Sequence, residues 1–322
     1  MTDLSIIIPI YNVEKFLTKC INSVLDNDWS GILYEIILVD DESPDRSLDI
    51  ALDFKNKYGN IKVISQKNIG LGGARNTGIK NAEGKYLFFL DSDDYFLKDK
   101  FQEVVKIALK NDIDILEFGA QRVNENYELI DTVFCKKNSD IFDGLTYVGH
   151  YSFDNSACNK IYKRSFLLQN GILFFEKTYV EDAPFNAEAF SKARSVMSVS
   201  KIPVAFYQNR NSITRQNRTG ENLRKFINDS IKVTHRIKEI ELSVTDMRAK
   251  KEFQKRISSF TAGTILMILK SKFTAAEKKK YLKDLRSAGL YPIKNSAGNI
   301  MRDFFILMVN NRFILSFLFK IL

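Results

Sequence analysis

The first 120 residues alternate short apolar runs with longer segments of helical periodicity. A helix that joins two parallel strands must pack on the face of their sheet, so this alternation predicts an α/β fold with a mostly parallel sheet flanked by helices. Helices are expected at 16–25 and 101–109, where apolar residues keep to one helical face. Strands are expected at Ser5–Ile10, Tyr34–Val39, Ile61–Ile64, Tyr86–Leu90 and Ile113–Phe118.

A third helix is expected to begin near Ser43, with Pro44 in its first turn, where a missing N–H costs nothing. Between 154 and 215 the pattern becomes irregular, which is typical of a side wall rather than of another strand–helix–strand unit. Short β-like pieces stand out there at 172–175 and 204–207. Helical periodicity then returns at 222–240, 247–269, 275–287 and 301–322.

Charge divides the chain in the same place. Residues 217–322 hold 22 Lys and Arg against 9 Asp and Glu, which leaves 26 against 30 for residues 1–216. We therefore predict a domain at 1–216 that carries the site and a basic helical region at 217–322. A basic region can face nucleic acid, an anionic membrane or only water. Nucleic acid is not expected, because aromatic residues that could stack on bases are not interleaved with the basic ones.

The last helical region also holds apolar runs at 304–309 and 313–322, separated by Asn310–Arg312. No uninterrupted span of membrane-crossing length results, so a transmembrane helix is not expected. Together with Lys278–Lys280, the runs suggest helices that lie on an anionic cytoplasmic leaflet. An ordinary helical bundle, or an interface between copies in a homo-oligomer, is the alternative.

Three cysteines, Cys20, Cys135 and Cys158, lie far apart and without metal-ligand spacing, which is typical of reduced thiols in a cytoplasmic protein. The segment MTDLSIIIPIYN has an acidic residue where a signal peptide is basic, and its apolar run is short. We expect no export signal.

Asp91, Ser92, Asp93 and Asp94 directly follow the fourth predicted strand. In an open parallel sheet, ligands bind beyond the carboxyl ends of the strands. Three carboxylates this close repel one another unless a cation offsets them, and Mg²⁺ or Mn²⁺ suits such oxygen ligands. The alternative is an acidic turn that caps the next helix.

Asp40 and Asp41 repeat the pattern after the second strand, as hydrogen-bond acceptors for a base or ribose or as a helix cap. After the third strand, Gly70, Gly72 and Gly73 allow close approach of a ligand, and Arg75 is expected in the first turn of the next helix, where a phosphate would be favoured. An NAD-binding fingerprint is not expected, because its sixth position is Arg75 and it does not follow the first strand.

With these residues assembled, the sequence resembles family 2 glycosyltransferases of the bacterial cell-surface polysaccharide type. The matching segments span Ser5 to Arg215 in family order: SIIIPIYNVEKFL, EIILVDDESPDRS, NIGLGGARNTGI, GKYLFFLDSDDYF, NKIYKRSFL, GILFFEKTYVEDAPF and FYQNRNSITR. The resemblance implies a GT-A fold, which is a Rossmann-like, mostly parallel sheet flanked by helices, here followed by the helical region.

The resemblance also implies roles for individual residues. The donor, expected to be a UDP-sugar, would be bound by Pro9, Tyr11, Asp41, Asn68, Arg75, Asp91, Ser92, Arg210 and Ser212. Asp93 would be the main ligand of Mn²⁺ or Mg²⁺, with Asp91 beside it, and Asp182 the general base next to Glu181. Neither His150 nor His235 lies in a matching segment, so no histidine ligand is expected. Lys160 either steadies phosphate or covers apolar surface.

The implied reaction moves one sugar to a hydroxyl of a glycan, lipid-linked or protein-linked acceptor. The metal would stabilise the departing nucleoside diphosphate while the base takes the acceptor proton, and direct displacement would invert the anomeric centre. Glu181-Asp182 could instead simply open a helix that ends near Phe190. A nucleotidyltransferase, or a non-catalytic carbohydrate-binding protein on the same fold, is the alternative for the whole chain.

Overall fold

The computed structural model describes residues 2–133, 137–208 and 218–321, and the chain divides into two compact units. The first unit contains the β-sheets and is built from Met1–Gly144, Asp154–Lys177 and Lys192–Gln216. The second unit is helical and is built from Leu145–Phe153, Thr178–Ser191 and Asn217–Leu322. The functional boundary at residue 217 stays a prediction, because two earlier stretches group with the helices that follow it.

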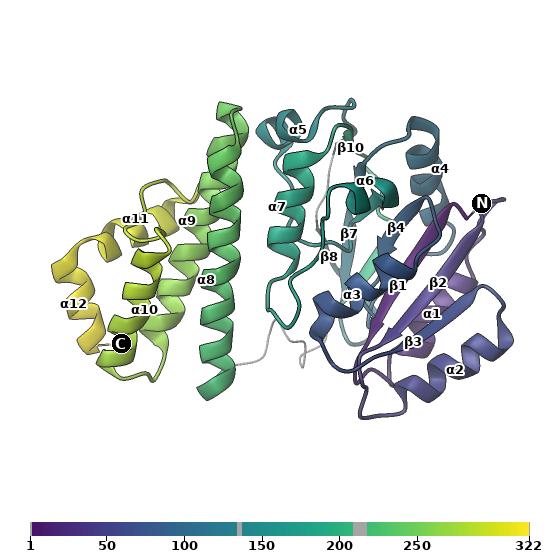
Figure 1. Ribbon diagram of the computed structural model, residues 1–322, viewed down its shortest axis with the longest axis horizontal. Helices are drawn as coiled ribbons and strands as arrows, with labels where there is room; N and C mark the ends of the chain where they lie inside the picture. The colour runs from purple at the N-terminus through teal and green to yellow at the C-terminus, as the bar shows by residue number, and fades with distance from the viewer. Residues whose placement is uncertain (1, 134–136, 209–217, 322) are drawn as a thin grey trace. The chain divides into compact units, whose positions relative to one another are not determined.

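The larger sheet of the first unit confirms the predicted α/β architecture (Figure 1). Its strands are β1 (Leu4–Ile10), β2 (Tyr34–Asp40), β3 (Ile61–Ser65), β4 (Tyr86–Phe89), β6 (Ile115–Glu117), β9 (Lys160–Lys163) and β10 (Val196–Ser198). They lie in the order β10-β6-β9-β4-β1-β2-β3. Neighbouring strands are parallel except at β9, which is antiparallel to β4 and β6. The five predicted strands are all present, whereas β9 and β10 come from the stretch predicted to be an irregular wall.

Helices cover both faces of this sheet. On one face, α1 (Leu17–Leu25), α2 (Ser47–Lys57) and α4 (Phe101–Asn111) bury apolar residues against the side chains of Ile6 and Ile8 and their neighbours. On the other face, α3 (Gly70–Asn81) lies so close to Ile7 that a Cβ at Gly78 would be 2.3 Å from that side chain. Successive residues of a strand point to opposite faces of the sheet, so one apolar strand packs against the helices on both faces.

Two local predictions are wrong. Helix α2 begins at Ser47 rather than near Ser43, because Asp45 accepts hydrogen bonds from the backbone N–H of Ser47 (3.1 Å) and of Glu14 (2.9 Å) and so holds a turn before the helix. Residues 172–175 form no strand, since the backbone N–H of Phe174 donates to the side chain of Asn76 instead of to a neighbouring strand (2.8 Å).

A smaller sheet belongs to the same unit. Its strands are β5 (Tyr95–Phe96), β7 (Ala120–Val123), β8 (Leu129–Val133) and β11 (Val204–Tyr207), and they lie in the order β5-β11-β7-β8. The strand predicted at 204–207 is therefore confirmed. The short helix α6 (Arg164–Gln169) follows β9 directly.

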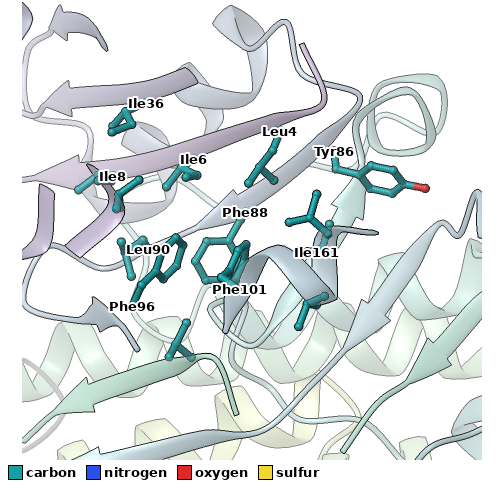
Figure 2. Packing of buried hydrophobic residues seen from close by; sticks show 14 of the residues in the cluster. Leu4, Ile6, Ile8, Ile36, Tyr86, Phe88, Leu90, Phe96, Phe101 and Ile161 are labelled. Carbon is teal, nitrogen blue, oxygen red and sulfur yellow. The ribbon is translucent and has the colours of Figure 1, made fainter. Parts of the chain in front are cut away.

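The core of the first unit lies between β1, β4 and α4, as Figure 2 shows. All seven residues of β1 are buried, which explains why its sequence is apolar from Ile6 to Ile10 rather than alternating. The ring of Phe101 stacks on Phe96 at 4.2 Å between centroids and lies 4.6 Å from Phe88. These contacts fix the chain on both sides of the turn that follows β4.

The second unit has a core of its own, made by the long helices α8 (Gly220–Ser243) and α9 (Met247–Lys270) with α10 (Ala275–Ser287). Helices α5 (Gly144–Tyr151) and α7 (Asp182–Lys192) contribute the earlier stretches, and Phe153 stacks on Phe190 at 4.6 Å. The helices predicted after residue 217 are confirmed up to residue 287. Helix α10 begins with a capping box, in which Thr274 and Glu277 each accept a hydrogen bond from the other's backbone N–H.

The final predicted helix is two helices, α11 (Ile300–Asn310) and α12 (Arg312–Ile321). The break lies at Asn311, whose side-chain oxygen accepts from the backbone N–H groups of Phe313 (3.0 Å) and Ile314 (3.2 Å) and thereby caps α12. Within the described residues, no helix combines the length and the apolar composition that crossing a bilayer requires.

Candidate active site

The carboxyl ends of β1, β2 and β4 lie side by side in the first unit. Ile10 is opposite Asp40 in the β1–β2 register, and Ile7 is opposite Phe89 in the β1–β4 register. The chain segments that leave these strands therefore meet at one edge of the sheet, where ligands of such sheets bind. Pro9 is buried inside β1, whereas Tyr11 is exposed just beyond its end.

The acidic turn, residues Asp91–Asp94, follows β4 at this edge. The turn is closed by a hydrogen bond from the backbone N–H of Asp94 to the carbonyl of Asp91 (2.9 Å). Asp94 is buried, and its carboxylate accepts from the backbone N–H of Tyr207 at 2.8 Å, so it anchors β11 of the small sheet. Ser92 is buried as well, while Asp91 and Asp93 are partly exposed. Asp91 and Asp93 are thus the carboxylates that a ligand can reach.

The electrostatics of the acidic turn favour a cation. Burial, and then the charge of Asp91, raise the pKa of Asp93 to about 6. Burial followed by the charges of Asp93 and Asp91 raises the pKa of Asp94 as well. A cation placed beside Asp93 would relieve this repulsion and lower both values.

The residues present fit a divalent ion that takes part of its ligands from the substrate. Within the described part of the chain, no three His, Cys, Asp or Glu side chains come together as a complete metal cluster. Mg²⁺, however, usually binds through one or two carboxylates together with substrate phosphates. Asp93 and Asp91 match that partial ligand set.

Arg75 supplies a positive charge to the same turn. It lies in the second turn of α3, not in the first as predicted, and it is buried. Its Nη2 contacts the Oδ1 of Asp91 at 2.7 Å and the Sγ of Cys158 at 3.8 Å, and its guanidinium lies 5.2 Å from the ring centre of Phe174. Arg75 therefore contacts Asp91 directly, and any contact with the donor stays a prediction.

Helix α3 is tied to the segment after α6 by close backbone contacts. Asn76 exchanges two hydrogen bonds with the backbone of Phe174, at 2.8 and 2.9 Å. A Cβ at Gly72 would lie 2.3 Å from the carbonyl oxygen of Phe175, so only glycine fits there. The predicted reason for this glycine, close approach of a ligand, is thus replaced by close approach of the protein's own backbone. The result is a fixed position for the Phe174 ring beside Arg75.

Asp41 organises the loop between β3 and α3. Its carboxylate accepts from the side chain of Gln66 (2.8 Å) and from the backbone N–H groups of Ile69 (2.9 Å) and Gly70 (2.8 Å). The side chain of Asn68 donates to the carbonyl of Asp41 at 3.0 Å. These bonds bring the predicted donor residues Asp41 and Asn68 together and give Asp41 the role of a cap for α3. Their contacts with a nucleotide stay predictions.

A buried ion pair links β6 and β9 to the segment that precedes Cys158. Glu117 of β6 and Lys160 of β9 are opposite each other in the strand register, both are fully buried, and Nζ and Oε1 lie 3.2 Å apart. Lys160 also donates to the carbonyls of Asp154 (2.9 Å) and Ser156 (2.7 Å), which precede Cys158. The position of Lys160 fits neither of its two predicted roles, which were contact with phosphate and cover of an apolar surface.

A group of aromatic residues next to the acidic turn was not found from the sequence. The ring of Tyr127 lies 5.2 Å from that of Tyr207 and 5.9 Å from that of Tyr95, and Lys19 lies over it. These residues come from α1, β5, β11 and the loop before β8, so no spacing in the sequence could bring them together. Tyr207 is bonded through its backbone to Asp94, which places the group beside the site.

The remaining predicted residues lie elsewhere. Asp182 is the first residue of α7, in the helical unit, and Glu181 before it is buried. The prediction that this pair opens a helix is therefore confirmed, while the role of Asp182 as a base stays a prediction. Arg210 and Ser212 lie outside the described residues.

A family model described as Glycosyl transferase family 2 matches residues 5–169. The chain is 36% identical over 216 residues to the uncharacterized glycosyltransferase EpsJ of Bacillus subtilis (strain 168), covering 65% of this chain and 62% of EpsJ. It is 33% identical over 198 residues to the poly(ribitol-phosphate) beta-glucosyltransferase of Bacillus spizizenii, covering 60% of this chain and 30% of that protein. The chain thus spans less than two thirds of the length of either relative.

A solved structure gives the same fold. Residues 1–349 of S. aureus TarS, in complex with UDP-GlcNAc, match the chain with a TM-score of 0.72 and 25% identity, covering 89% of this chain and 80% of that one. This likeness confirms the predicted architecture of a mostly parallel, helix-flanked sheet followed by helices.

Proposed function

Since the chain belongs to glycosyl transferase family 2, we propose that it transfers a sugar from a nucleoside diphosphate donor to an acceptor hydroxyl during synthesis of a cell-surface glycan. The observation that carries the proposal is the acidic turn, which follows β4 at the sheet edge where β1 and β2 also end. UDP is the favoured nucleotide because TarS was solved with UDP-GlcNAc. The acceptor is a glycan, free or linked to lipid or protein.

The donor is proposed to lie across the ends of β1, β2 and β4. Tyr11 and Asn68 face the base, with Pro9 and Asp41 shaping the wall behind them, and Asp91 and Ser92 lie nearer the ribose. Arg75 supports this arrangement by holding Asp91, since their contact at 2.7 Å fixes one carboxylate oxygen. Arg210 and Ser212 are proposed to act on the diphosphate.

Asp93 and Asp91 are proposed to hold Mn²⁺ or Mg²⁺. Such an ion, when bound, stabilises the negative charge that develops on the departing diphosphate. Burial and then the charge of Asp91 raise the pKa of Asp93 to about 6, which supports this role because a bound cation would offset the cost of keeping both carboxylates ionised.

Asp182 is proposed to accept the proton of the attacking acceptor hydroxyl. A positioned carboxylate of this kind contributes roughly 10²- to 10⁴-fold to a transfer rate. Attack on the face opposite the leaving group would invert the anomeric centre. The position of Asp182 as the first residue of α7 supports the role, because a side chain carried by a helix is held more precisely than one on a loop.

The test is release of nucleoside diphosphate from a panel of nucleotide sugars, with and without Mn²⁺ or Mg²⁺. We expect release by the wild type with at least one sugar, and a loss of roughly 100-fold or more in Asp93→Asn. Asp53→Asn, on the exposed side of α2, is the matched control and should release at the wild-type rate. Full release by Asp93→Asn, or none from the wild type across the panel, would contradict the proposal.

We also propose that the protein is cytoplasmic and attaches peripherally to the inner face of the plasma membrane. Residues 217–322 hold 22 Lys and Arg against 9 Asp and Glu, and this net positive charge supports attachment to anionic lipid. Lys278 does not contribute, because it is buried and donates to the carbonyl of Leu269 (2.9 Å), whereas Lys279 and Lys280 are exposed. An interface between copies of the chain is the alternative.

A further inference from the structure

Helices α11 and α12 expose an unusual number of large apolar side chains. Six residues, each 61–88% exposed, define what is here called the apolar face: Ile300, Met301, Phe304, Leu307, Phe313 and Phe317. Ile300, Phe304 and Leu307 recur at spacings of four and three, which places them on one side of α11. Single exposed apolar residues are ordinary, but six along two consecutive short helices mark an interaction surface.

The opposite sides of α11 and α12 pack into the core of their unit. Ile306 and Val309 of α11 and Leu315 of α12 are buried with residues of α9 and α10. The side chain of Tyr291 donates to the carbonyl of Val309 at 2.6 Å, and Asn310 exchanges hydrogen bonds with the backbone of Ile293. The two helices are therefore anchored to their unit with the apolar face directed outward.

We infer that the apolar face inserts into an anionic lipid bilayer, so that α11 and α12 lie in its interface. This inference rests on the proposed peripheral attachment and not on the transfer reaction. An 11-residue helix is about 16 Å long, too short to cross a hydrocarbon core of about 30 Å but suited to lie in its boundary.

The net positive charge around the apolar face favours a bilayer over a second copy of the chain as its partner. Without the buried Lys278, residues 270–321 carry ten Lys and Arg and three Asp and Glu, and Arg312 directly precedes Phe313. Asp303 is occupied within the unit, since it accepts from Ser296 (2.7 Å) and from the backbone of Ala297 (2.6 Å). A twofold contact would bring two such positive regions together, whereas anionic headgroups neutralise them.

The test is flotation of the full chain with vesicles of phosphatidylglycerol and phosphatidylcholine in about equal parts. The triple variant Phe304→Ser, Leu307→Ser, Phe313→Ser should bind roughly tenfold more weakly or worse, because the apolar area available for insertion is lost. The matched control is Leu242→Ser with Met247→Ser, at two residues of the same unit that are 67% and 75% exposed, and it should float like the wild type. All three proteins should share one melting temperature.

A second measurement reports insertion itself. Phe313→Trp should be quenched by brominated lipid, against the background of Trp29, which is the chain's single tryptophan and is buried. Equal flotation of the triple variant, or absence of quenching in Phe313→Trp, overturns the inference while leaving attachment by charge intact. Failure of the wild type to float overturns attachment as well. A dimer in sedimentation without lipid that the triple variant abolishes would assign the face to a second copy.

Discussion

Arg75 places a positive charge at the acidic turn, because its guanidinium contacts Asp91 at 2.7 Å and Asp93 and Asp94 belong to the same turn. We predict that Arg75→Met lowers the transfer rate roughly tenfold or more, since Asp91 is then free to move and repels its neighbours. The free energy of unfolding should fall by about 1 to 3 kcal/mol.

The matched control for Arg75 is Arg122→Met, which removes an ion pair of the same unit, with Asp131, whose side chains are both more than a third exposed. That change should cost under about 1 kcal/mol and leave transfer unchanged. Urea unfolding and diphosphate release measure both quantities. Equal effects of the two variants on transfer would show that Arg75 has no special place at the acidic turn.

The buried ion pair of Lys160 and Glu117 leads to a second prediction. Lys160→Met alone removes the ammonium group that lies 3.2 Å from the fully buried Glu117 carboxylate and should cost roughly 3 to 5 kcal/mol. Adding Glu117→Gln removes the buried negative charge but keeps an acceptor for the backbone N–H of Asp154, now at 3.0 Å. The double variant should therefore be more stable than the single one in urea. A double variant that is less stable than Lys160→Met would contradict this account.

Among the helices and strands, the sequence predicts those whose formation depends on local periodicity. Strands β1 and β4 are fully buried, largely apolar runs because both faces of the sheet are covered, and helices α8 to α10 follow the 3.6-residue repeat. Strand β9 was missed because it is four residues long and joins the sheet between β4 and β6, through pairing with residues far away in sequence. The same holds for the site: the acidic turn is local, whereas its support by Arg75 and Phe174 depends on tertiary contacts.

Helix α10 allows a prediction of pH dependence. Hydrogen bonds from Arg224 and then from Thr274 lower the pKa of Glu277 from its ordinary 4.5 to about 2. A carboxyl whose pKa is lower in the folded state stabilises the fold above its ordinary pKa, and this contribution is lost as the pH falls through the lowered value. Glu277→Gln should therefore be less stable than the wild type at neutral pH, and the gap should close between pH 4.5 and about 2.

Glu221 offers the control for this measurement. It contacts the same Arg224 at 3.0 Å, but its side chain is 89% exposed and takes no part in the capping box. Glu221→Gln should change stability little at any pH, because exposed pairs contribute little. The urea unfolding midpoints of the two variants, measured across this pH range, test the prediction. A gap for Glu277→Gln that stays constant with pH would refute the assignment.

In the whole molecule, the two compact units are not consecutive stretches of the chain. The sequence suggests a boundary at residue 217 because charge and periodicity change there, and both are local properties. It gives no signal that 145–153 and 178–191 join the later helices, because that grouping rests on contacts such as Arg236 with Glu188 at 3.1 Å. Asp182 is consequently carried by a stretch of the helical unit that is inserted into the sequence of the first.

Each unit has its own hydrophobic core, one gathered around β1 and β4 and the other around α9 and α10, so we predict that the two unfold in separate steps. Leu285→Ala, at a fully buried position of the second core, should cost roughly 2 to 5 kcal/mol and lower the midpoint of the helical signal in far-ultraviolet circular dichroism. Trp29 stacks on Tyr34 at 4.4 Å in the first unit, so its fluorescence reports that unit alone. Its midpoint should stay at the wild-type value in Leu285→Ala. A common shift of both signals would instead mean that the inserted stretches couple the two cores into one cooperative transition.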